Sequence, residues 1–211
     1  AITVIGTLLH VLVMSMVAYP LSRDNLVGRR FITLIFVFIM YFNGGLIPTY
    51  LIIKALRLTN TIWSLILPGA ISTFNMIILR NYFSAIPDSV EESARLDGCS
   101  NFGTFFRIVF PLSLPAVATV CVYTAVGFWN SYFNALIYID RKALWPLSLY
   151  LREIVVEVDS QTVNLNPELS NINPQSMRAA AVIAATVPIL IVYPLLQRYF
   201  VQGVMLGAVK E

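Results

Sequence analysis

Long uncharged apolar segments alternate with short segments that hold nearly all of the charged residues. Five windows contain no Asp, Glu, Lys or Arg: 1–22, 31–53, 58–79, 108–139 and 179–197. A membrane-spanning helix needs roughly 20 mainly apolar residues, and a charge at the bilayer centre costs about 2.5–3.5 kcal/mol. The pattern therefore predicts five transmembrane helices, at about 1–22, 31–53, 60–81, 112–139 and 179–200.

The composition agrees with this interpretation. Of the 211 residues, 58% are hydrophobic and 12% are charged, whereas soluble domains carry about 25% charged residues. Two cysteines are too few for a disulfide framework, and the +3 net charge forms no basic run that would favour nucleic acid. We expect a single all-α transmembrane helical bundle over residues 1–211, in a multi-pass membrane protein.

The basic residues orient the predicted spans only weakly. The best cytoplasmic marker is the short loop at 22–30, which holds Arg23, Arg29 and Arg30. It places the loop at 83–110 in the cytoplasm and the loop at 140–178 outside. Because the chain starts without Met and is already apolar, we expect that a preceding N-terminal helix is missing.

Polar residues recur at helical spacing within the spans, and Gly and Pro interrupt several of them. Intramembrane amides and hydroxyls either join helices or line a path. We interpret the first-span stripe, which includes His10, as helix–helix hydrogen bonding. A lone histidine cannot form a metal site, so no metal is expected. The three stripes are Thr3, Thr7, His10 and Met14; Ser64, Pro68, Ser72 and Asn75; and Tyr123, Gly127, Asn130 and Asn134.

The segment 127–134 combines amides with large aromatic side chains, as sugar-binding sites do. Ring faces pack on the C–H surfaces of a sugar, and amides bond its hydroxyls. An aromatic belt at the membrane interface is an equally good interpretation. The candidate substrate-path residues are Asn43, Asn75, Tyr123, Trp129, Asn130, Tyr132 and Asn134.

The loop at 83–110 carries capping signals for two short helices. Asp88 and Glu91 are expected to form a capping box, and Gly98 suits the left-handed residue that ends the helix. Ser100 or Asn101 is expected to cap the second helix. An interfacial membrane anchor is one interpretation. The acidic excess favours a basic protein partner instead, because anionic lipid attracts basic faces.

This loop resembles a motif of inner-membrane permeases in binding-protein-dependent ABC importers. That family has the pattern Glu-Ala-Ala-x3-Gly-x9-Ile-x-Leu-Pro, and this chain departs from it at Ser93 and Phe110. The segments 42–50, 129–130 and 202–210 look like the carbohydrate-uptake branch, related to maltose- and alginate-type permeases. The matching run here is Glu92-Ser93-Ala94-x3-Gly98-x9-Ile108-x-Phe110-Pro111.

The resemblance implies a type I ABC importer permease fold in the bacterial inner membrane. The helix around Glu92 would dock in a cytosolic ATPase dimer as a coupling helix. Further implied partners are a second homologous permease subunit, an extracytoplasmic solute-binding protein, a sugar substrate and membrane lipid. The coupling residues would be Glu91, Glu92, Ser93, Ala94, Arg95, Asp97 and Gly98.

No catalytic or cofactor site is expected on this chain, since the G-x-x-x-x-G-K-[ST] phosphate loop is absent. ATP and Mg would be bound by the ATPase partners. The alternatives are an ABC permease for a non-sugar solute, a scaffolding subunit, and an ion-coupled secondary transporter. The last would need buried ionisable residues, of which the spans offer only His10. The 140–178 loop is either a docking surface for the binding protein or a solvated linker.

Overall fold

The computed structural model describes residues 1–42, 44–159 and 174–207, with side chains described up to 156 and from 175 to 191. The described part consists of helices and their connections and contains no strand, which confirms the all-α class. The elements are α1 (Ile2–Ser22), α2 (Arg29–Tyr41), α3 (Leu46–Ala55), α4 (Trp63–Ile66), α5 (Thr73–Ser84), α6 (Asp88–Leu96), α7 (Asn101–Thr104), the π-helix η1 (Phe105–Val109), α8 (Phe110–Leu112), α9 (Leu114–Trp129), α10 (Tyr132–Tyr138), the 3₁₀-helix η2 (Lys142–Leu144), α11 (Leu147–Asp159) and α12 (Pro174–Gly207).

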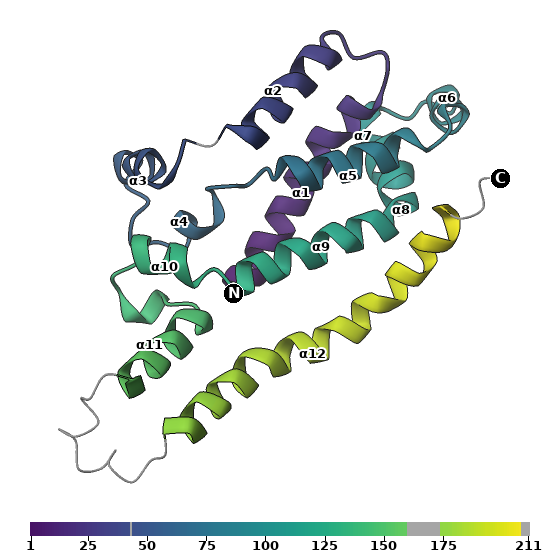
Figure 1. Cartoon of the computed structure of the whole chain (residues 1–211). Helices are drawn as coiled ribbons and strands as arrows, with labels where there is room; N and C mark the ends of the chain where they lie inside the picture. The colour runs from purple at the N-terminus through teal and green to yellow at the C-terminus, as the bar shows by residue number, and fades with distance from the viewer. Residues whose placement is uncertain (43, 160–173, 208–211) are drawn as a thin grey trace.

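The centre of the bundle is α1, which packs against α5 and α9, while α12 lies along α9 (Figure 1). The short helices α6, α7 and α8 lie at one end of the molecule, and α3, α4, α10 and α11 lie at the other. We call these the α6 end and the α10 end. Met14, Met76, Leu79 and Val120 have no exposed surface in the main core cluster. Because residues on one face of a helix recur every three to four positions, α1 buries one face, on which Val11, Met14, Ala18 and Leu21 alternate with polar residues such as Thr7, His10 and Ser15.

Three of the predicted spans are each divided between two helices. The 31–53 span is split into α2 and α3, the 60–81 span into α4 and α5, and the 112–139 span into α9 and α10. Gly45 and Gly69 have φ values of +84° and +82° at the first two breaks, a conformation that glycine adopts without strain. Ser72 then caps α5 by accepting a hydrogen bond from the Asn75 amide at 3.4 Å.

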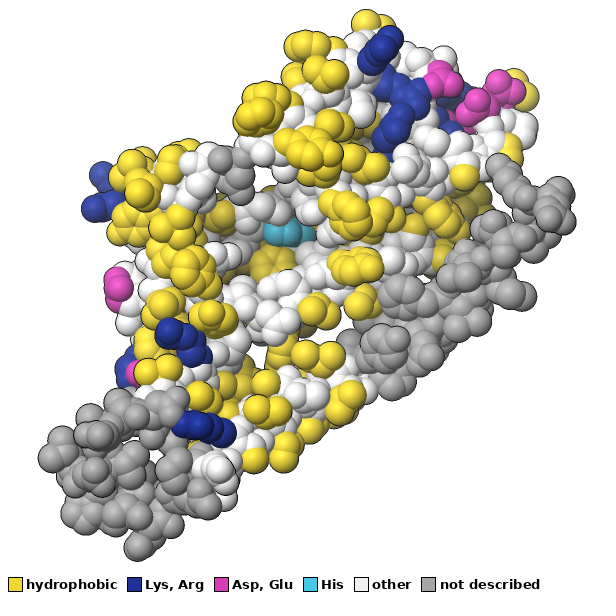
Figure 2. Space-filling view, in the orientation of Figure 1, with side chains coloured by type: hydrophobic (Ala, Val, Ile, Leu, Met, Phe, Trp, Pro, Cys, Tyr) yellow, Lys and Arg dark blue, Asp and Glu magenta, His cyan; other side chains and the backbone are white. Residues whose placement is uncertain are grey.

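Only α1 among the described helices is by itself long and apolar enough to cross a membrane. The number rises to three if two bent pairs each count as one span, namely α2 with α3 and Asn101–Leu112 with α9, the latter bent by 81°. The five-span topology therefore stays a prediction. On the face in Figure 2, charged side chains lie towards the two ends and hydrophobic ones cover much of the middle.

Candidate functional site

The loop at 83–110 folds as two short helical segments joined at a left-handed glycine. Helix α6 ends before Gly98, whose φ is +80°, and the Ser100 hydroxyl accepts a hydrogen bond from the Gly103 amide at 3.2 Å. The predicted turn and the predicted Ser100 cap are thus confirmed. The capping box is wrong: Pro87 is the N-cap of α6, and no side chain caps that end. The carboxylates of Asp88 and Glu91 instead pair with a distant arginine.

The predicted coupling residues divide between the two faces of α6. Glu91 and Ala94 are buried against the protein, at 4% exposure each. The adjacent Leu96 is 89% exposed, although no sequence motif pointed to it. The predicted coupling residues that are exposed are Glu92, Ser93, Arg95, Asp97 and Gly98.

Arg23, directly after α1, holds α6 against the bundle. Its Nη2 lies 2.5 Å from Glu91 Oε1, and its Nη1 lies 3.3 Å from Asp88 Oδ1. The same Nη1 donates to the Ile86 carbonyl at 3.4 Å, and the guanidinium lies 5.6 Å from the centroid of the Tyr19 ring. In the sequence Arg23 served only as a topology marker, because its partners are more than 60 positions away.

A second candidate site is an open cavity of about 250 Å³ between α1, α5 and α9. All three polar stripes contribute to it, which helical spacing alone could not establish. Its described lining has no Asp, Glu, Lys or Arg and offers hydroxyl, amide and imidazole groups beside aromatic rings. The lining residues are His10, Leu65, Pro68, Ser72, Asn75, Tyr123, Thr124, Gly127, Phe128, Ser131 and Asn134.

Of the predicted path residues, Asn75, Tyr123 and Asn134 line this cavity. The other described members do not. Trp129 Nε1 donates to the Ala185 carbonyl of α12 at 3.1 Å. Asn130 is exposed.

The Arg152 guanidinium carbon lies over the Tyr132 ring, 5.4 Å from the centroid of that ring. Asn43 lies outside the described residues. The path assignment stays a prediction.

Three helices meet at His10. Its Nε2 lies 2.5 Å from the Ile66 carbonyl at the end of α4, and its ring meets the Phe128 ring edge-on at 4.8 Å between centroids. The helix–helix hydrogen bond expected for the first-span stripe is observed at His10, whereas the buried Thr7 hydroxyl has no hydrogen-bond partner among the described residues. His10 also lines the cavity, as do Ser72, Thr124 and Ser131, none of which was among the predicted path residues. Among the described residues, no group of His, Cys, Asp and Glu could hold a metal ion.

Comparison with known proteins gives the same picture along nearly the whole chain. Residues 9–206 match the family model described as binding-protein-dependent transport system inner membrane component. The chain is 46% identical over 211 residues to the polygalacturonan/rhamnogalacturonan transport system permease protein YtcP of Bacillus subtilis, covering 99% of this chain and 74% of that protein. It is 44% identical over 210 residues to protein LplC of the same organism, covering 99% and 71%.

A solved structure has the same fold. It is a bacterial ABC transporter involved in the import of the acidic polysaccharide alginate, and the match has a TM-score of 0.83 at 33% identity. The match covers 95% of this chain and 73% of that chain. The helical arrangement, the motif at 92–111 and the family match agree. The chain belongs to the family of binding-protein-dependent transport system inner membrane components.

Proposed function

We propose that this chain is a membrane-spanning permease subunit of an ATP-driven importer that carries a sugar or oligosaccharide into the cytoplasm. The observation that carries the proposal is the cavity in which all three polar stripes meet. Its neutral hydroxyl, amide and aromatic groups suit a ligand rich in hydroxyls. The relatives support the substrate class, because one is a permease for polygalacturonan or rhamnogalacturonan and another imports alginate.

In this proposal the chain has no catalytic or cofactor site of its own. A cytosolic ATPase dimer binds ATP and Mg and docks on the exposed face of α6 through Glu92, Arg95 and Asp97. A second permease subunit completes the translocation path, and an extracytoplasmic binding protein delivers the sugar. Five spans in the bacterial inner membrane would place α6 on the cytoplasmic side. ATP-driven closure of the ATPase dimer would move α6 and open the cavity to the opposite side.

The favoured alternative substrate is a non-sugar solute in the same type of importer. An ion-coupled secondary transporter has less support, because the described cavity lining contains no acidic or basic residue apart from His10. The imidazole of His10 already contacts a backbone carbonyl there. The choice between a sugar and another solute therefore depends on what the cavity binds.

The test is sugar uptake by the complete complex reconstituted in proteoliposomes with its ATPase, partner permease and binding protein. Asn134→Leu removes an amide from the cavity, and we expect it to lower uptake by about tenfold, the value of one hydrogen bond of about 1.4 kcal/mol. Asn130→Leu makes the same change in a residue outside the cavity, so its effect should be smaller. Equal uptake by the wild type and Asn134→Leu, or no stimulation of ATP hydrolysis by neutral or acidic oligosaccharides, would contradict the proposal.

A further inference from the structure

Two adjacent acidic residues of α6 have opposite environments. Glu91 is 4% exposed and pairs with Arg23, whereas Glu92 is exposed. Consecutive residues of a helix differ by about 100° in direction, so one carboxylate faces the bundle while its neighbour faces outwards. Both residues were expected to contact the ATPase, but only Glu92 is placed to do so.

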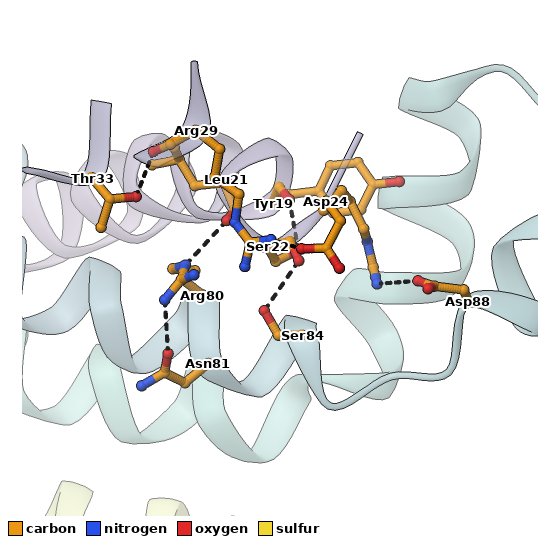
Figure 3. A network of polar contacts seen from close by, with 11 residues as sticks. Tyr19, Leu21, Ser22, Asp24, Arg29, Thr33, Arg80, Asn81, Ser84 and Asp88 are labelled. Carbon is orange, nitrogen blue, oxygen red and sulfur yellow. Dashed lines mark hydrogen bonds and ion pairs between the residues drawn. The ribbon is translucent and has the colours of Figure 1, made fainter. Parts of the chain in front are cut away.

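The buried carboxylate attaches α6 to α1 rather than to the helices next to it in sequence. Figure 3 shows other polar contacts around the C-terminal end of α1, including the one that reaches Asp88 of α6. There the Leu21 carbonyl accepts from Arg80 Nε at 3.1 Å, and the Ser22 carbonyl accepts from the Ser84 hydroxyl at 3.1 Å. The last carbonyls of a helix have no partner within the helix. Here α5 supplies two partners, and Arg23 extends the connection to α6.

The same helix α1 reaches the cavity at its other half. His10 lines the cavity, 13 positions before Arg23. At 1.5 Å per residue, α1 therefore spans about 20 Å between the α6 attachment and the cavity. Pro20 lies inside this stretch but α1 continues through it to Ser22, so one continuous helix connects Arg23 with the segment around His10.

We propose that the Glu91–Arg23 ion pair is a positioning linkage that transmits the movement of α6 to α1 and so to the cavity. Glu92 faces the ATPase, and Glu91 connects α6 to the translocation helix. The proposal rests on the proposed function, since it assigns the route by which the ATPase acts on the cavity. Removal of one partner of such a buried pair leaves the other charge uncompensated, so the linkage cannot be loosened without consequence.

The experiment measures ATPase association, ATP hydrolysis and sugar uptake separately in the complete reconstituted complex. Glu91→Ala breaks the linkage, and we expect the ATPase to remain bound while uptake per ATP hydrolysed falls by about 2- to 30-fold. Glu91→Gln keeps an acceptor for Arg23 and should give an intermediate ratio. Glu92→Ala is the matched control on the exposed face, and it should weaken ATPase association instead.

A second measurement does not depend on sugar. Hydrogen exchange along residues 6–14 of α1 should change when ATP binds to the wild-type complex, and this change should be lost in Glu91→Ala. If the complex with Glu91→Ala does not assemble, uptake per ATP hydrolysed and hydrogen exchange are compared between Glu91→Gln and the wild type instead. An uptake-per-ATP ratio and an ATP-dependent exchange pattern equal to those of the wild type would overturn the linkage. Absence of sugar uptake by the wild type, with an intact exchange response, would contradict only the proposed function.

Discussion

The two ends of α1 are held by different kinds of interaction. At the α6 end, Leu21, Ser22 and Arg23 form hydrogen bonds and ion pairs with α5 and α6. Towards the α10 end, the backbone of Gly6 lies against the Phe128 ring, and His10 makes one contact with a carbonyl. Hydrogen bonds are directional and specify one position, whereas apolar packing is not directional. The α6 end is therefore fastened mainly by directional polar contacts, and the cavity end mainly by close packing.

Among the described residues, buried side-chain atoms without a hydrogen-bond partner occur at both ends of α1. The hydroxyls of Thr7 and Thr124, on α1 and α9 near the cavity, are buried and have no hydrogen-bond partner within the described part of the chain. An unpartnered buried hydroxyl is unfavourable, and a bound ligand or a shifted helix can satisfy it. At the α6 end, Arg23 Nε and the hydroxyls of Thr104 and Ser113 are likewise buried without a hydrogen-bond partner in the described part of the chain. The two ends therefore differ in how the last backbone carbonyls of α1 are bonded, not in the number of unpartnered side-chain atoms.

The largest expected loss of stability comes from removing the ion pair between Arg23 and Glu91 at the α6 end. Arg23→Ala leaves Glu91 buried without its cation, and we expect the free energy of unfolding to fall by about 3–5 kcal/mol. Asp88→Ala removes a partner whose side chain is 80% exposed, so its effect should stay below about 1 kcal/mol. Denaturant unfolding of the detergent-solubilised protein measures both. Similar losses in the two variants would show that the Glu91 pair is not the main attachment.

A smaller loss of stability is expected towards the α10 end, where Gly6 of α1 packs against Phe128. A Cβ at Gly6 would lie 2.5 Å from the Phe128 ring, so Gly6→Ala forces this buried ring to move and should cost about 1–3 kcal/mol. Gly127→Ala is the matched control, because nothing lies within 4 Å of a Cβ there. Since alanine favours helix over glycine, that control should be neutral or slightly stabilising. Thermal unfolding in detergent compares them, and equal destabilisation would refute the close approach at Gly6.

The smallest loss of stability is expected at the contact between His10 and the Ile66 carbonyl. His10→Leu removes the partner of the Ile66 carbonyl, and the loss should be about 0.5–1.5 kcal/mol, the net value of one hydrogen bond. His10→Gln retains a donor and should lose less. The same unfolding assay separates the two variants. A loss as large as that of Arg23→Ala would mean that α1 is fastened equally at both ends.

Local sequence signals predicted local geometry well at Gly98 and Ser100. A left-handed turn needs only one residue without a Cβ, and a cap needs only a hydroxyl three residues before an amide. The capping box failed at Asp88 and Glu91 although its spacing was correct. Both carboxylates pair with a cation from a distant part of the chain, and such charge-assisted contacts are stronger than a hydrogen bond between neutral groups.

The sequence predicted some of the residues that line the cavity, but it did not predict that they meet. Helical spacing grouped Asn75 with Ser72 and Tyr123 with Asn134, but it contained no information on whether the two groups face each other. The break between α4 and α5 and the end of α9 at Asn130 decide which members meet. Trp129, at the end of the same helix, bonds to α12 instead. Its direction depends on a helix more than 40 positions further along the chain.

The sequence by itself determined the apolar helical class, the family motif at 92–111 and the glycine turn of the loop at 83–110. Each depends on residue type over a short stretch of chain, so it can be recognised without the fold. Only the tertiary structure decided that Glu91 faces inwards to Arg23 while Glu92 faces outwards, and that three polar stripes converge on one cavity. Those features depend on the relative rotation and position of helices far apart in sequence, which packing against α1 fixes.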